Sequence, residues 1–216
     1  MDDAHLIIFD CDGTLVDSEP IANRVFVEQV QEFGIPLTDE EAWKHFPGTS
    51  LEECMQYVTK TYGFIFPEDF VPSHRERQRV AFAKDIKPIQ GVKIALDQIP
   101  FAKCVASNGP LLAVRSNLEA TGLLAYFDGF FSAHEIERWK PEPDLFLHAA
   151  AKLDRMPEQC LVVEDSDAGI LAARRAGMKV LAYQPVHSHY TLSENGTMSF
   201  DDMKQLPELV QHLLVK

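Results

Sequence analysis

Short apolar segments alternate with helical segments through much of this 216-residue chain, and this alternation constrains the fold more than any other feature. Segments 103–106, 127–132, 161–163 and 179–183 have the length and composition of strands. Helical spacing marks segments 111–120, 144–153, 168–176 and 205–215. Such alternation is typical of a parallel sheet with helices on both faces. With the apolar run 6–9 as a further strand, the sequence predicts an α/β fold with a Rossmann-like parallel sheet core.

Residues 17 to 87 differ from the rest, because they carry only helical signals. A first helix is expected to end near Gly34 and Pro36. Capping boxes, in which Ser or Thr precedes Glu by three residues, stand at 38–41, 50–53 and 73–76. The expected domains are therefore core residues 1–16, an inserted all-helical unit at 17–87, and core residues 88–216. A surface loop is expected at 186–198, around Asn195-Gly196.

The charge balance limits the partners of this chain. It has 33 Asp and Glu residues against 20 Lys and Arg residues, a formal net charge of −13 at pH 7. Nucleic acid and anionic membranes require a basic face, so neither is an expected partner. No apolar run approaches the ~20 residues of a transmembrane helix, and Met1-Asp2-Asp3 lacks the basic flank of a signal peptide. The four scattered cysteines lack metal-ligand spacing, so we expect reduced thiols and a cytoplasmic protein.

The first expected strand ends in carboxylates. Asp10 and Asp12 directly follow the apolar run, and Gly13 is expected to bend the chain so that both acids border one small pocket. Adjacent carboxylates repel unless a cation or a proton lies between them. Mg²⁺ takes oxygen ligands and often uses only one or two carboxylates. Taken alone, the motif is equally compatible with a solvated acidic turn.

Polar side chains also follow the later strands. These are Ser107, Lys140, and the pair Glu164 and Asp165. Because ligands bind at the carboxyl ends of strands in open α/β sheets, the fold would gather these groups beside Asp10. Taken singly, Ser107 is interpreted as a helix N-cap and Lys140 as a solvated lysine. The acidic segment after the fourth strand can simply cap the next helix, and Ser166 or Asp167 is the expected cap. Together they favour a site for an anionic, phosphate-bearing ligand and a cation.

This order of motifs resembles the haloacid dehalogenase-like superfamily. Its four motifs are matched by Asp10-Cys11-Asp12-Gly13-Thr14, Ser107-Asn108-Gly109, Lys140-Pro141 and Glu164-Asp165-Ser166. The helical insertion resembles the smaller cap domain of that superfamily. More narrowly, the chain resembles the sugar-phosphate phosphatase and β-phosphoglucomutase branch, and segments 31–35, 107–110, 138–141 and 205–209 resemble those of 6-phosphogluconate phosphatases.

The resemblance implies a magnesium-dependent phosphatase that hydrolyses a small phosphorylated metabolite, a sugar or sugar-acid phosphate such as 6-phosphogluconate, through an aspartyl phosphate. Asp10 is the implied nucleophile, and Asp12 the general acid and then the general base. Mg²⁺ is implied at Asp10, Asp165 and the backbone carbonyl of Asp12, with Glu164 nearby. The phosphate-binding residues are then Ser107, Asn108 and Lys140, and the hypothesised substrate contacts from the cap are Gly48, Thr49 and Ser50.

Other functions fit less well. In a β-phosphoglucomutase-like mutase, a histidine stands where this chain has Ala22, and basic residues flank the loop that is 46–51 here. Dehalogenases lack the second acid of the first motif, which is present as Asp12. A phospho-accepting signalling domain is usually a compact unit of ~120 residues without an insertion. The expected partner is one small phosphomonoester, and the protein is expected to be a monomer or a weak homodimer.

Overall fold

The computed structural model describes residues 5–46, 48–185 and 197–214. The chain forms two compact units. Met1–Asp17 and Lys87–Lys216 together are called the core unit, and Ser18–Ile86 is called the helical unit. The helical unit is continuous in sequence and interrupts the core unit between its first two strands.

The core unit contains a six-stranded sheet in the order β3-β2-β1-β4-β5-β6, and each neighbouring pair is parallel. The strands are β1 (Leu6–Phe9), β2 (Ala102–Ser107), β3 (Gly129–Ser132), β4 (Cys160–Glu164), β5 (Lys179–Tyr183) and β6 (Met198–Phe200). The predicted α/β fold is confirmed. The loop prediction for 186–198 is wrong at Met198, which begins β6, while 186–196, including Asn195-Gly196, lies outside the described residues.

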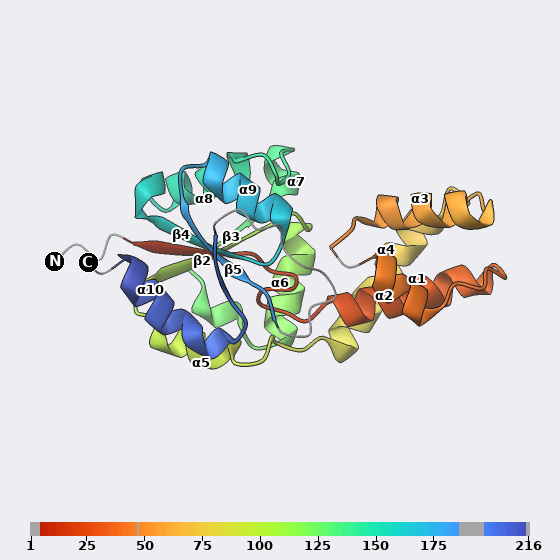
Figure 1. Ribbon diagram of the computed structural model, residues 1–216, viewed down its shortest axis with the longest axis horizontal. Coiled ribbons are helices and arrows are strands. Elements are labelled where there is room, and N and C mark those ends of the chain that lie inside the picture. Colours follow the sequence, from red (N-terminus) through yellow and green to blue (C-terminus); the bar gives the residue numbers. More distant parts are fainter. Residues whose placement is uncertain (1–4, 47, 186–196, 215–216) are drawn as a thin grey trace. The chain divides into compact units, whose positions relative to one another are not determined.

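Helices lie on both sides of this sheet (Figure 1). They are α5 (Val92–Gln98), α6 (Leu111–Ala120), α7 (Ala133–Ile136), α8 (Asp144–Lys152), α9 (Asp167–Arg175) and α10 (Leu206–Leu214). Figure 1 shows α8 and α9 on one face, with α5 and α10 on the other. The sequence did not predict α5 and α7, because segments of seven and four residues are too short to show a clear helical period.

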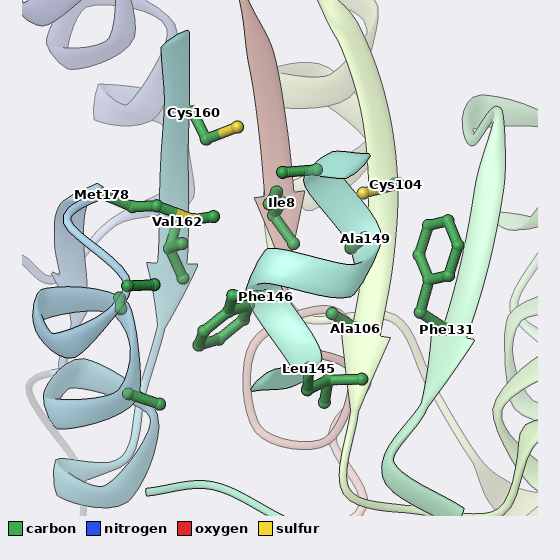
Figure 2. Packing of buried hydrophobic residues seen from close by; sticks show 14 of the residues in the cluster. Ile8, Cys104, Ala106, Phe131, Leu145, Phe146, Ala149, Cys160, Val162 and Met178 are labelled. Carbon is green, nitrogen blue, oxygen red and sulfur yellow. The ribbon is translucent and has the colours of Figure 1, made fainter. Parts of the chain in front are cut away.

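The central strand β1 places the first acid motif. All four of its residues are buried, as expected for a parallel strand covered on both faces. Phe9 pairs in register with Val105 of β2 and with Val163 of β4, so the carboxyl ends of these strands lie next to each other. Figure 2 shows α8 packed over this part of the sheet, with Phe146 and Ala149 directed toward the strands.

The helical unit has its own core. Its helices are α1 (Glu19–Glu32), α2 (Asp39–His45), α3 (Leu51–Tyr62) and α4 (Phe70–Asp85). The Phe26 ring makes edge contacts with Phe46, Phe70 and His74. The His74 ring, which is buried, also stacks on Phe70, and its Nδ1 lies 2.9 Å from Gln29 Oε1. The unit therefore buries a polar pair inside an aromatic cluster.

The expected capping boxes have different outcomes. Ser50 and Glu53 form the full reciprocal box at the start of α3. Thr38 caps α2, because its side chain accepts a hydrogen bond from the Glu41 N–H. The box expected at 73–76 is wrong, since Ser73 lies inside α4, which begins at Phe70. The aromatic contacts of Phe70 extend that helix upstream of the local capping signal.

Two absences concern the described residues alone. There, no helix is long and apolar enough to cross a membrane. The cysteines Cys11, Cys54, Cys104 and Cys160 are free and buried.

Candidate active site

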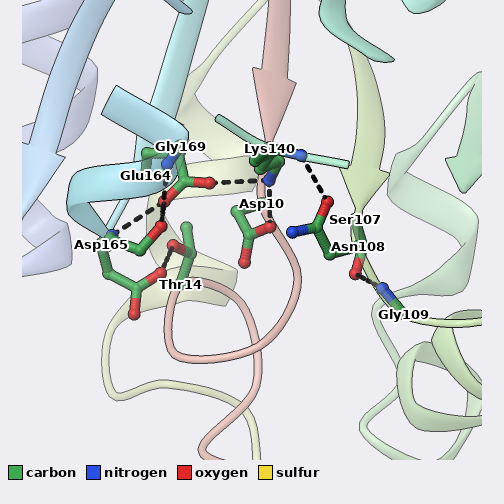
Figure 3. Close-up of polar contacts among 10 residues, drawn as sticks. Asp10, Thr14, Ser107, Asn108, Gly109, Lys140, Glu164, Asp165 and Gly169 are labelled. Atoms are coloured by element: carbon green, nitrogen blue, oxygen red, sulfur yellow. Dashed lines mark hydrogen bonds and ion pairs between the residues drawn. The ribbon is translucent and has the colours of Figure 1, made fainter. Parts of the chain in front are cut away.

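Asp10, Lys140 and Glu164 form a buried ion-pair cluster at the carboxyl end of the sheet (Figure 3). Asp10 directly follows β1, and Glu164 is the last residue of β4. The Lys140 Nζ contacts Asp10 Oδ1 and donates a hydrogen bond of 2.7 Å to Glu164 Oε1. The side chain of Lys140 is only 3% exposed, so it is not the solvated lysine that its local sequence alone suggested.

The electrostatics of this cluster are set by burial and by mutual charge. Burial raises the pKa of Asp10 to about 7 against the lowering effect of Lys140, and the carboxylates of Glu164 and Asp12 raise it further. Burial lowers the pKa of Lys140, but the charges of Asp10 and Glu164 outweigh burial and raise it above its ordinary value. Lys140 therefore stays cationic, and the site holds more negative than positive charge. Such a site favours a further cation.

Asp165 accepts a hydrogen bond from the Thr14 hydroxyl and packs against the backbone of Gly13. Thr14 Oγ1 donates a hydrogen bond of 2.7 Å to Asp165 Oδ1. Gly13 has a φ of +83°, and a Cβ on it would stand 2.1 Å from Asp165 Oδ2. This turn therefore needs glycine both for its backbone conformation and for space. The first and fourth motifs are thus in direct contact.

Glu164 is similarly enclosed. Ser166 donates to Glu164 Oε2 through its backbone N–H at 2.8 Å and through its hydroxyl at 2.9 Å. A Cβ on Gly169 would lie 1.7 Å from Glu164 Oε1. Ser166 also caps α9 by accepting from the Gly169 N–H, as the sequence predicted for Ser166 or Asp167.

Ser107 is the last residue of β2, Asn108 follows it, and both border the same cluster (Figure 3). Helix α6 begins at Leu111 with Pro110 at its N-cap, so the interpretation of Ser107 as an N-cap is wrong. Instead, Ser107 Oγ accepts a hydrogen bond of 3.0 Å from the Gly109 N–H. Asn108 Oδ1 accepts a hydrogen bond of 3.0 Å from the Lys140 backbone N–H, which ties this loop to the lysine. The second and third motifs therefore meet.

Asp12 differs from Asp10 in its environment. Asp10 is only 8% exposed, whereas Asp12 is an exposed residue. A Cβ placed on Gly109 would lie 3.8 Å from Asp12 Oδ2, so this carboxylate faces the loop after β2. The structure thus brings together Asp10, Asp12, Ser107, Asn108, Lys140, Glu164 and Asp165. Among the described residues, however, no three His, Cys, Asp or Glu side chains are already arranged as metal ligands.

The expected cap contacts lie in the helical unit and have local partners. The Gly48 N–H donates to Glu19 Oε1 at 3.1 Å. Thr49 Oγ1 donates to the Phe46 carbonyl at 2.8 Å, and Ser50 caps α3. All three residues are exposed. The Gly48 N–H and the hydroxyls of Thr49 and Ser50 serve local structure, so a role toward substrate stays a prediction.

Sequence reasoning missed the supporting hydroxyls. Thr14 stood in the first motif without a role, and Ser132, which donates to the Gly109 carbonyl, was given none. A hydroxyl residue at the end of a strand is the signal that Ser132 shares with Ser107, whereas Thr14 lies in the turn after β1. That signal alone does not tell a ligand contact from a structural bond.

Similarity to known proteins assigns this chain to a class of hydrolases. Residues 7–183 match the family Haloacid dehalogenase-like hydrolase, and the chain belongs to this family. It is 37% identical over 206 residues to the 6-phosphogluconate phosphatase of Escherichia coli K12, an alignment that covers 94% of this chain and 93% of that protein. The predictions of the family and of the enzyme class, a phosphoric monoester hydrolase, are confirmed.

Solved structures agree with this assignment. A haloacid dehalogenase-like protein of unknown function from Agrobacterium tumefaciens superposes with a TM-score of 0.86 at 33% identity, covering 96% of this chain and 98% of that one. A family hydrolase from Deinococcus radiodurans, with bound phosphate and sodium, gives a TM-score of 0.80 at 26% identity, covering 98% and 97%.

Proposed function

We propose that this protein is a magnesium-dependent phosphatase that hydrolyses a small sugar or sugar-acid phosphate through an aspartyl phosphate on Asp10. One observation carries the proposal: Lys140 is buried between Asp10 and Glu164 at the carboxyl edge of the sheet. A carboxylate attacks an anionic phosphate poorly unless nearby positive charge neutralises the developing charge. A buried lysine at the attacking carboxylate supplies such charge.

The proposed hydrolysis consists of two successive displacements at phosphorus, and both use Asp10 and Asp12. In the first, an Asp10 oxygen bonds to phosphorus, the bond to the leaving oxygen breaks, and Asp12 gives that oxygen its proton. In the second, water attacks phosphorus, Asp12 takes the water's proton, and the bond to Asp10 breaks, which releases inorganic phosphate. The exposure of Asp12 and the burial of Asp10 support this division, because the general acid must reach the leaving group and then water.

The residues present fit Mg²⁺. Oxygen donors converge here, and the pKa of Asp10 is raised by burial and by surplus negative charge, which a cation would relieve. Asp10, Asp165 and the backbone carbonyl of Asp12 would hold the ion, with Glu164 near it. When bound, Mg²⁺ would neutralise phosphoryl charge. Thr14 and Ser166 orient the two acids of the fourth motif.

Ser107, Asn108 and Lys140 are proposed to bind the phosphoryl oxygens. Since Ser107 Oγ accepts from the Gly109 N–H, its own proton is directed to another acceptor. Since Asn108 Oδ1 accepts from the Lys140 N–H, its amide Nδ2 is the end available to an anion. The structure of a relative from Deinococcus radiodurans holds bound phosphate, which is in keeping with a phosphate-binding role.

The proposed substrate is a sugar-acid phosphate, for which the Escherichia coli relative is named. Its distal carboxylate needs a cation or N–H donors, because burying an unpaired charge is costly. The helical unit offers three candidate donors, Arg24, Lys44 and His45. Arg24 already donates to Asp85 at 2.6 Å, and the His45 ring is stacked on Tyr57. Lys44 is therefore the best candidate. Higher kcat/KM on 6-phosphogluconate than on glucose 6-phosphate would support this substrate, and the reverse order would exclude it.

The test of the general proposal is phosphate release from a panel of sugar, sugar-acid and nucleoside monophosphates with Mg²⁺. The wild type should release phosphate, and chelation should stop it. Asp10→Asn should be inactive, whereas Asp97→Asn, which changes an exposed carboxylate that accepts from Tyr126, should keep full activity. Substantial turnover by Asp10→Asn would overturn the proposal. The substrate contacts from residues 48–50, a cytoplasmic location and a monomeric or weakly dimeric state stay predictions.

A further inference from the structure

Ser132 is the last residue of β3, lies outside the motifs, and makes a hydrogen bond to Gly109 in the loop that follows Ser107. It is 1% exposed and pairs in register with Ser107 of the adjacent strand β2. Its hydroxyl donates a hydrogen bond of 2.7 Å to the Gly109 carbonyl. The same oxygen accepts from the His134 N–H at 3.2 Å. This hydroxyl therefore donates its one proton to Gly109 and accepts from His134.

Gly109 connects Ser132 to Ser107. Its N–H donates to Ser107 Oγ at 3.0 Å, while its carbonyl accepts from Ser132. The fit is close, because a Cβ on Gly109 would lie 3.3 Å from Ser107 Oγ. The bond from Ser132 fixes the position of the Gly109 carbonyl and so limits the orientation of the Gly109 N–H. The N–H in turn limits the rotamer of Ser107 and the direction in which its hydroxyl proton points.

We propose that Ser132 is a positioning residue, which aims the Ser107 hydroxyl at the phosphoryl group through Gly109. This inference rests on the proposed function, since it assumes that Ser107 binds phosphate. The two hydrogen bonds of Ser132 have separable effects. The bond that Ser132 accepts caps the short helix α7 and should affect only the stability of the protein. The bond that it donates to Gly109 should affect the affinity for phosphate.

The test is a double-mutant cycle on phosphate affinity. Inorganic phosphate binding is measured by calorimetry with Mg²⁺ present, together with kcat and KM on the best substrate of the panel. Ser132→Ala should weaken phosphate binding and raise KM about tenfold, the size of effect expected from one lost hydrogen bond. In a Ser107→Ala background, Ser132→Ala should have almost no further effect, because both act through one hydroxyl.

The matched control is Thr121→Val. Thr121 Oγ1 is a buried hydroxyl that donates to the Asn117 carbonyl at 2.8 Å, at the far end of α6, the helix that follows the loop. Thr121→Val should lower the melting temperature without changing phosphate affinity. If Ser132→Ala fails to fold, Ser132→Cys replaces it, because a thiol of similar shape donates only weakly.

The outcomes separate the two proposals. If the wild type binds phosphate and Ser132→Ala behaves as Thr121→Val does, the inference is wrong and the phosphatase stands. Additive losses in the Ser107→Ala background would also refute it, since they indicate a purely structural role. If the wild type neither binds phosphate nor hydrolyses any ester, the proposed function fails and this inference fails with it.

Discussion

Replacing Lys140 by methionine tests whether this lysine is the internal counter-charge of the site. In the structure its Nζ contacts Asp10 and lies 2.7 Å from Glu164 Oε1, with 3% of the side chain exposed. Methionine has a similar length and keeps the contact with the Phe146 ring, whose centroid lies 4.9 Å from Nζ. The variant therefore removes the charge and leaves most of the packing in place.

The expected loss of stability is large. Removing one partner of a buried ion pair leaves uncompensated charge and typically costs about 3–5 kcal/mol. This is a large part of the ~5–15 kcal/mol that stabilises a typical domain. Neutralising Glu164 as well, in Lys140→Met/Glu164→Gln, should recover part of the loss, because one of the two unpaired carboxylates is then gone.

Urea unfolding measures both variants. Circular dichroism follows the helices of both units, and fluorescence of Trp139, adjacent to Lys140 in sequence, follows the core unit in a Trp43→Phe background. The control is Arg77→Met, which breaks an ion pair of 2.6 Å with Glu32 whose side chains are 41% and 55% exposed. Water already screens that pair, so its loss should shift the urea midpoint only slightly. If Lys140→Met shifts the midpoint no more than Arg77→Met does, the reasoning is refuted.

Other predictions concern other parts of the chain. Burial lowers the pKa of His74 to about 4 from 6.5, so the unfolded chain binds a proton there that the folded chain does not. Stability should therefore fall as the pH falls from about 6.5 to 4, by up to about 3 kcal/mol, and His74→Leu should lack this dependence in urea titrations at each pH. Gly169→Ala should destabilise the protein and lower activity, although alanine normally favours a helix by ~1 kcal/mol, because its Cβ would meet Glu164 Oε1 at 1.7 Å; a raised melting temperature would contradict this. Asp12→Asn should reduce kcat more on an alkyl than on an aryl phosphate, whose leaving group needs less protonation, and equal losses would argue against a general acid.

The core unit was predictable from sequence where signals were long and local. Buried parallel strands such as β1 and β4 read as continuous apolar runs, and Leu111–Ala120 was found to the residue. The edge strand β6 was missed, because two of its three residues are exposed and their pairing with β5 leaves no local pattern. The capping signal at Ser73 predicted a helix start there, but α4 begins three residues earlier at Phe70, whose aromatic contacts stabilise the added turn.

The site was predictable in its members but not in its contacts. Because each motif follows a predicted parallel strand, the sequence correctly predicted that Asp10, Lys140 and Glu164 lie at one edge of the sheet. That Lys140 lies between the two acids depends on residues 130 and 24 positions away, and no local pattern encodes such a contact. Likewise, Ser132 became visible as a partner of Gly109 only through the pairing of β2 with β3.

Trapping the phosphoenzyme tests the central claim most directly. The enzyme is mixed with its best substrate and Mg²⁺, stopped with acid during turnover, and treated with borohydride, which reduces an acyl phosphate on aspartate to homoserine. Peptide mass spectrometry should then find homoserine at position 10 in the wild type and none in Asp10→Asn. Covalent phosphate on another residue, or full turnover with position 10 never modified, would contradict the account.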